Sequence, residues 1–362
     1  MKNILKTIAV LVSASLISVS AKAGELTVTG SAKASYLVNG GNDTGKAMGI
    51  SNELNFTASG EMDNGFTWKY HTELDPADGG AASNDDTAIV IGMGDLGTLG
   101  IYDAEGGLST ELGWGIGAMG TGADYANTMT NIGRGYDVSS DPHVAYTTAA
   151  GLLPLGIQAS IGYAPNTADG QSNSYKAGGA QADADADGTN ATQYKVTMAP
   201  IDGLKISADF YEVGGNSSSA VSQEKMGGNI SAQYAAGNFK IGYTHGQLQP
   251  AKTTDKYSDS ADTATALNGD HYESDGIGIE FAVNDQLSLS ISEEDFTREI
   301  TSMGAEASTS TRTSVESSQT TIMAAYNIGG ATLGLSLVDT DNSDYTASRD
   351  ETKTIVSLAL AF

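Results

Sequence analysis

The chain has 362 residues, with 44 Asp and Glu against 18 Lys and Arg, and its formal net charge is −26. A surplus of acids this large opposes binding to a phosphate backbone, so no nucleic-acid partner is expected. There is no cysteine, which excludes disulfides and a cysteine nucleophile.

The first 23 residues have the pattern of an export signal. Lys2 and Lys6 precede an apolar run at residues 8–19, and the run is followed by a small-x-small cleavage site at residues 21–23. The apolar run is too short to span a membrane as a helix, and no later run reaches eighteen residues. We predict a signal peptide at 1–23 and one mature domain at 24–362, with a charge of −29 because three lysines leave with the signal.

Most of the mature chain consists of short segments in which apolar and polar residues alternate. They begin with LTVTGSAKASYLV at residues 26–38 and end with KTIVSLALAF at the carboxyl terminus, and Asp63-Asn64-Gly65 is a strong hairpin signal. Alternation of this kind predicts strands with one apolar face. We count about sixteen strands.

The connections between these strands are of two kinds. Tight turns such as DNG, DLG, PIDG and GG alternate with long loops rich in Asp, Ser, Thr and Gly. An acidic secreted β-sandwich or adhesin fits the composition almost as well as a membrane barrel does. Short turns at one rim and long loops at the other are typical of outer-membrane barrels, so the pattern favours an all-β, transmembrane antiparallel β-barrel.

Outward and inward rows can be read along the strands. Leu333, Leu335 and Leu337 oppose Thr332, Gly334 and Ser336. In the last strand the row of Val356, Leu358, Leu360 and Phe362 opposes a row of smaller side chains. Since side chains alternate between the faces of a strand, we expect the larger row to face lipid.

The longest irregular stretch runs from Tyr102 to Asp141. It has about forty residues, keeps no period of two and is dense in glycine. A loop of this length inside a regular β pattern is usually functional or disordered. We interpret it as folded and functional.

The chain resembles the general diffusion porins of Gram-negative outer membranes. The resemblance rests on the signal, the opening ELTVTGSAKASY, the paired strands AIVIGMGDLGTLGIYDA leading into the long loop, and the terminal phenylalanine. It implies a trimer of sixteen-stranded barrels, a long third loop folded into each lumen, and a Phe362 that the barrel-assembly machinery recognises. It also implies contact with membrane lipid and lipopolysaccharide.

The resemblance and the charges together predict the residues of the pore constriction. The third loop contributes six acids and one arginine: Asp103, Glu105, Glu111, Asp124, Asp137, Asp141 and Arg134. Family members commonly place arginines near the starts of the second and fourth strands, where this chain has Glu53 and Asp86. The usual transverse field is therefore in question, and rings of acids favour cations.

Two motifs resemble binding sites for other ligands. Gly115, Gly117 and Gly120 form G-x-G-x-x-G without the strand and helix that a dinucleotide site needs, so chance is the better interpretation. Asp183, Asp185 and Asp187 with Gly188 resemble the start of a calcium loop, but the twelfth position is Tyr194 and not glutamate. We expect no dedicated metal site and no cofactor, and at most weak calcium binding at the acidic loops.

The four histidines stand far apart and no hydrolase motif is present, so we expect no enzymatic activity. The sequence predicts an outer-membrane channel for passive diffusion of small hydrophilic solutes and ions, with a preference for cations. One alternative is a substrate-selective channel with a binding row in the lumen. The other is a surface-adhesive or structural barrel that acts through its acidic loops.

Overall fold

The computed structural model of the chain describes residues 24–76, 82–112, 135–165, 167, 190–214, 221–250, 252–253, 271–302 and 311–362. Three predicted features lie outside the described residues. These are the signal peptide, the part of the third loop with Asp124 and Arg134, and the acidic run with Asp183, Asp185 and Asp187.

The described chain is almost entirely strand, as the alternating pattern predicts. The strands are β1 (Glu25–Gly41), β2 (Gly45–Glu61), β3 (Thr67–Pro76), β4 (Ala82–Gly92), β5 (Thr98–Asp103), β6 (His143–Thr147), β7 (Gln158–Ala164), β8 (Ala191–Ile201), β9 (Leu204–Val213), β10 (Val221–Gln223), β11 (Lys225–Ala236), β12 (Phe239–Gln249), β13 (Lys252–Thr253), β14 (His271–Ala282), β15 (Leu287–Ser302), β16 (Thr311–Asn327), β17 (Ala331–Asp341) and β18 (Glu351–Ala361). Short 3-10 turns occur at η1 (Gly94–Leu96), η2 (Val138–Ser140), η3 (Pro154–Gly156) and η6 (Ser343–Tyr345). Within the described residues, no helix has both the length and the apolar character needed to cross a bilayer.

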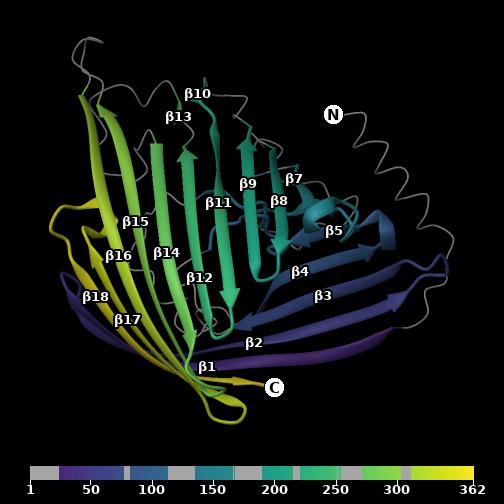
Figure 1. The fold of residues 1–362 in the computed structure, drawn as a ribbon, viewed down its shortest axis with the longest axis horizontal. Helices are drawn as coiled ribbons and strands as arrows, with labels where there is room; N and C mark the ends of the chain where they lie inside the picture. Colours follow the sequence, from purple (N-terminus) through teal and green to yellow (C-terminus); the bar gives the residue numbers. More distant parts are fainter. Residues whose placement is uncertain are drawn as a thin grey trace.

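All strands except β10 and β13 form one closed barrel, which confirms the predicted architecture and the count of sixteen strands. Each strand pairs antiparallel with its neighbours, and β1 closes the ring by pairing with β18 (Figure 1). Strands β10 and β13 form a separate two-stranded ribbon. Closure leaves no open sheet edge, so every strand of the ring has a partner on both sides.

The two faces of each strand divide as the sequence predicts. Leu333, Leu335 and Leu337 on β17 are exposed, whereas Ser336 and Val338 between and beyond them are buried. On β18, Val356 and Leu358 are exposed and Ser357 is buried. The exposed apolar rows form the outer surface of the barrel. The opposite rows therefore face its interior.

Tight turns join the strands at one rim. At the predicted Asp63-Asn64-Gly65 turn, Gly65 has φ +82°, which glycine adopts without strain. Gly203 joins β8 to β9 with φ +78°, and a Cβ there would come within 2.2 Å of the Ala235 carbonyl oxygen. The predicted alternation of short and long connections is not strict, because residues 42–44 at the other rim join two 17-residue strands.

An apolar cluster lies inside the barrel. It joins inward-facing side chains of the wall, such as Tyr211 on β9 and Tyr272 on β14, to Leu108, Tyr136 and Val138 from the third loop. Tyr136 and Tyr211 pack with ring centroids 5.6 Å apart. The described ends of the third loop, residues 104–112 and 135–142, therefore lie against the inner wall. The course of the rest of this loop stays a prediction.

Candidate pore-lining site

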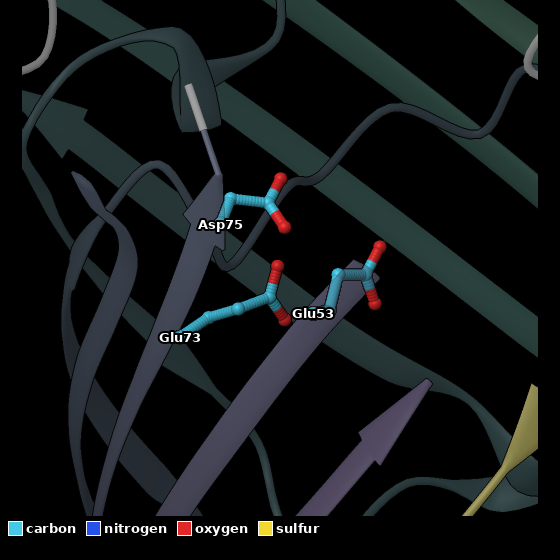
Figure 2. A group of neighbouring side chains, drawn as sticks. All are labelled: Glu53, Glu73 and Asp75. Carbon is cyan, nitrogen blue, oxygen red and sulfur yellow. The ribbon is translucent and has the colours of Figure 1, made fainter. Parts of the chain in front are cut away.

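A group of acids lies on the inner face of β2 and β3. Val28 is exposed on the outer face of β1, so Ser31 lies in the inward row of that strand. Glu53 pairs in register with Ser31, and Glu73 pairs with Asn55 from the row of Glu53, so both acids face inward. Carboxylate oxygens of Glu53, Glu73 and Asp75 all lie within 4.8 Å of one another. Figure 2 shows these three side chains side by side on the two neighbouring strands.

Glu53 was predicted here from the sequence, whereas Glu73 and Asp75 were not. Their signal was present in the stretch HTELD, where alternate positions put both acids on the same face as His71. Asp86, predicted for this wall, is on β4 where the register with β3 shifts, and its charge acts on the Glu73 carboxylate. The wall thus brings together two predicted acids and two that were not predicted.

The third loop returns to this wall directly after β5. Nε2 of His71 lies 3.1 Å from Oε1 of Glu105, so the predicted loop acid contacts the strand that carries Glu73. Asp103, by contrast, ends β5 in the row of the exposed Ile101. That row faces outward. The register therefore does not bring Asp103 to the lumen as predicted.

Two other predicted constriction acids hold the loop together. Oδ1 of Asp137 accepts hydrogen bonds from the N–H groups of Leu108 and Ser139, and Oδ2 accepts one from the N–H of Ser109. Asp137 thereby joins the two ends of the loop. Asp141 is only 4% exposed and accepts a hydrogen bond of 2.8 Å from the Tyr136 hydroxyl. A side chain this buried cannot line a water-filled bore, which corrects the expectation for Asp141.

Burial also perturbs the ionisation of this pair. Desolvation raises the pKa of Asp141 above its ordinary value of 3.8, although the Tyr136 hydroxyl and the charge of Lys225 act in the opposite direction. Desolvation, followed by the hydrogen bond to Asp141, raises the pKa of Tyr136. Both groups therefore favour their neutral forms more than they would in water.

A buried polar network fixes the loop to the wall. Asp209 on β9 accepts hydrogen bonds at Oδ1 from both the N–H and the hydroxyl of Thr110, at 2.6 Å and 2.7 Å. The side-chain amides of Gln193 and Asn229 also donate to the Asp209 carboxylate. Gln193 in addition accepts the N–H of Val138 at 2.8 Å. None of these wall residues was predicted from the sequence.

Glu111, the next predicted acid, lies beside wall lysines. It lines a pocket of about 120 Å³ together with Lys195 on β8 and Lys205 on β9. The described part of the site thus carries acids on the β2–β4 wall and lysines on the β8–β9 wall. Strands β3 and β9 are six positions apart in the ring of sixteen strands, so the acidic wall and the lysine wall are separate parts of the barrel.

The terminal Phe362 lies at the seam where the barrel closes. Its N–H donates to the Gly30 carbonyl at 2.9 Å, and its own carbonyl accepts the N–H of Gly30 at 2.7 Å. A Cβ at Gly30 would lie 2.6 Å from the Phe362 ring, so a larger residue here would clash with the ring. This backbone contact is independent of the predicted recognition by the assembly machinery.

No protein-family model matches the chain, and no curated protein matches it in sequence. Solved structures do match it in fold. An anion-selective porin from Comamonas acidovorans has a TM-score of 0.62 at 14% identity, over 94% of this chain and 100% of that one. OmpF of Salmonella typhi, in complex with daunomycin, has a TM-score of 0.61 at 13% identity, over 94% and 98%.

OmpT, an outer membrane protein of Vibrio cholerae, has a TM-score of 0.61 at 11% identity, over 95% of this chain and 99% of that one. Identities this low carry no information about which solutes pass or which residues act. The structural matches do establish the architecture, since they span nearly the whole length of this chain and of each matched chain. The chain has the fold of the sixteen-stranded porins.

Proposed function

We propose that the chain is an outer-membrane channel for passive diffusion of small hydrophilic solutes and ions, and that it prefers cations. The observation that carries the proposal is the group of Glu53, Glu73 and Asp75 on the inner wall of a closed barrel. Fixed carboxylates in a narrow aqueous bore raise the local concentration of cations and repel anions.

The outer membrane is the location that this fold supports. An exposed apolar outer surface with a polar inner one is stable in lipid only when the sheet is closed. The likeness to outer-membrane porins points to the same location. Surface contact with lipid and lipopolysaccharide belongs to this proposal.

A trimer is also part of the proposal. On β2, Met48 is 83% exposed and Ile50 is 73% exposed, well above the lipid-facing leucines of β17. On β4 and β5, Ile89 and Ile101 are further exposed apolar side chains of the outer surface. Packing of one barrel wall on another would cover these side chains.

The proposal assigns no catalysis and needs no cofactor. The three wall acids offer the oxygen ligands that calcium prefers. We treat them as a field for mobile cations, because exposed acids are common without a bound ion. A substrate-selective channel is the alternative that the lumen geometry favours most.

Recording from single channels in planar bilayers tests the function. Purified protein is expected to give discrete conductance steps in potassium chloride. Passive diffusion predicts a conductance that rises in proportion to salt at high concentration. A barrel that only serves adhesion through its acidic loops would give no steps, and this result would overturn the proposal.

A further inference from the structure

We propose that the inner wall carries a subsite for a small oxyanion, the carboxylate or phosphate group of a solute, formed by Lys195, Lys205 and the hydroxyls beside them. This inference rests on the proposed channel function and refines it towards selectivity. The subsite lies in the pocket of about 120 Å³ beneath the described root of the third loop.

The strand register brings both lysines to the interior. Lys195 lies in the row of the buried Gln193, while its neighbour Val196 is 47% exposed on the outer surface. Lys205 lies in the row of Ser207 and Asp209, both of which are buried. Both residues line the same pocket and reach it from two adjacent strands.

The rest of the pocket supplies neutral hydrogen-bonding groups. Ser207 pairs in register with Ser231, and Lys205 pairs with Gln233, so two hydroxyls and an amide line the wall side. Residues 109–112 of the third loop cover the other side. Hydroxyls and amides can donate to an oxyanion alongside the ammonium groups.

The acids near the pocket keep their negative charge, and the charges of Asp137 and Asp209 act on Lys195. Asp209 is occupied by hydrogen bonds from Thr110, Gln193 and Asn229, and Asp137 by three backbone N–H groups of the loop. Among the described residues neither Lys195 nor Lys205 makes an ion pair. Glu111 is the one carboxylate among the described residues that line the pocket, so the oxygens of Asp137 and Asp209 stay with their own hydrogen-bond donors.

Another lysine of the inner wall makes a useful contrast. Lys240 on β12 pairs in register with Glu280 on β14, and its ammonium lies 3.4 Å from Oε2 of that acid. Its charge is already balanced within the wall. The two pocket lysines make no such ion-pair contact in the described chain, so their ammonium groups are available to an anion from solution.

The volume and the chemistry define the ligand. A space of about 120 Å³ is far larger than a single water needs and can hold a carboxylate or phosphate group. The acids of the β2–β4 wall lie four to seven strand steps from β8 and β9 and would not contact this group. They would instead favour solutes that carry a positive charge at a distance from the oxyanion.

The test uses inorganic phosphate as the probe and the folded protein in detergent. Phosphate is titrated against wild type while the phosphorus NMR linewidth is measured, which requires no conduction. We expect saturable broadening in wild type. In Lys205→Gln, and more strongly in Lys195→Gln/Lys205→Gln, the half-saturating concentration should rise about tenfold or more, as for loss of a charge-assisted hydrogen bond.

Matched controls separate charge loss from damage to the barrel. Lys240→Gln removes an inner lysine that is already paired and should bind phosphate like wild type. Lys195→Arg retains the charge and should keep most of the binding even if Lys195→Gln folds poorly. Acetate distinguishes the two sources: displacement of phosphate by acetate identifies a general carboxylate site, and no displacement identifies a phosphate site.

The proposal is overturned if wild type shows no saturable broadening, or if all lysine variants broaden the signal equally. Single-channel recording separates this failure from failure of the channel function. Conductance steps without phosphate binding would remove the subsite and leave the channel. Absence of steps would remove the channel, whatever the detergent titration shows.

Discussion

The N–H and the hydroxyl of Thr110 both donate hydrogen bonds to one oxygen of Asp209, a residue 99 positions away in the sequence. The contact joins the third loop to the inner wall at β9. Both groups are buried, so water cannot replace the bonds. An unsatisfied buried donor costs about 1–3 kcal/mol, which makes this contact a strong constraint on the loop.

Replacement of Asp209 should therefore release the loop root. We expect Asp209→Ala to lower the free energy of unfolding by about 1–3 kcal/mol and to increase proteolysis within the loop. Asp209→Asn keeps an acceptor oxygen and should have the smaller effect. Thermal unfolding in detergent and limited proteolysis measure both outcomes. Equal stability in wild type and Asp209→Ala would contradict a role for this contact.

The buried Asp141 predicts a pH dependence of stability. Its folded-state pKa lies above the ordinary 3.8, so the folded protein holds the proton more tightly than the unfolded chain does. The stabilisation is complete below pH 3.8 and is lost as the pH rises through the raised folded-state value. In that pH range, ionisation of the buried carboxylate increasingly destabilises the folded protein.

Asp141→Asn removes the ionisable group while keeping an oxygen that can accept a hydrogen bond from the Tyr136 hydroxyl. We expect the melting temperature of the variant to gain on that of wild type as the pH rises from 3.8, and then to keep a constant difference. Unfolding curves at successive pH values provide the measurement. Parallel pH profiles for the two proteins would show that Asp141 titrates as it does in water.

The barrel seam separates two roles of the terminal residue. Deletion of Phe362 removes both backbone hydrogen bonds to Gly30, whereas Phe362→Ala keeps them. In refolding from denaturant into detergent, we expect the deletion to give less heat-modifiable barrel than Phe362→Ala. In cells, recognition of the ring by the assembly machinery predicts that both variants assemble poorly. Normal assembly of Phe362→Ala in cells would contradict that recognition.

The trimer is tested at its apolar face. Met48→Asp with Ile50→Asp places two charges on the most exposed apolar stretch of β2 and should convert trimers to monomers in mild detergent. Leu335→Asp, on the outer row of β17, is the matched control that should leave the subunit number unchanged. Light scattering coupled to size exclusion measures the mass. A wild type that is monomeric throughout would remove the trimer from the account.

Local patterns predicted the fold well because each strand carries its own signal. The outward row of Leu333, Leu335 and Leu337 and the turn before Phe66 follow from neighbouring residues alone. Barrel closure then follows because every strand needs two partners in lipid. The predicted strand ends were less accurate. Strand β1 continues to residue 41, past the predicted segment at residues 26–38, and β2 already starts at residue 45.

The site was harder to predict because its contacts join distant segments. No local signal connects Thr110 to Asp209 or Glu105 to His71. Asp141 was assigned to the bore from the resemblance and the charges, but it is buried within the third loop instead, because burial depends on tertiary packing. Glu73 could have been predicted, since it lies two positions after His71 and therefore on the same face of the strand.

In the proposed channel, the acids of the β2–β3 wall set the preference for cations. The measurement is the reversal potential across a potassium chloride gradient, for wild type and for Glu53→Gln/Glu73→Gln/Asp75→Asn. Glu293→Gln serves as control, because Glu293 lies in the outward row of Ile291.

Wild type should prefer potassium at low salt, and the preference should fade as the screening length falls from about 10 Å at 0.1 M to about 3 Å at 1 M. The triple variant should lose most of the preference at low salt, and Glu293→Gln should keep it. A wild-type channel that prefers chloride, or a triple variant with unchanged reversal potential, would contradict the account.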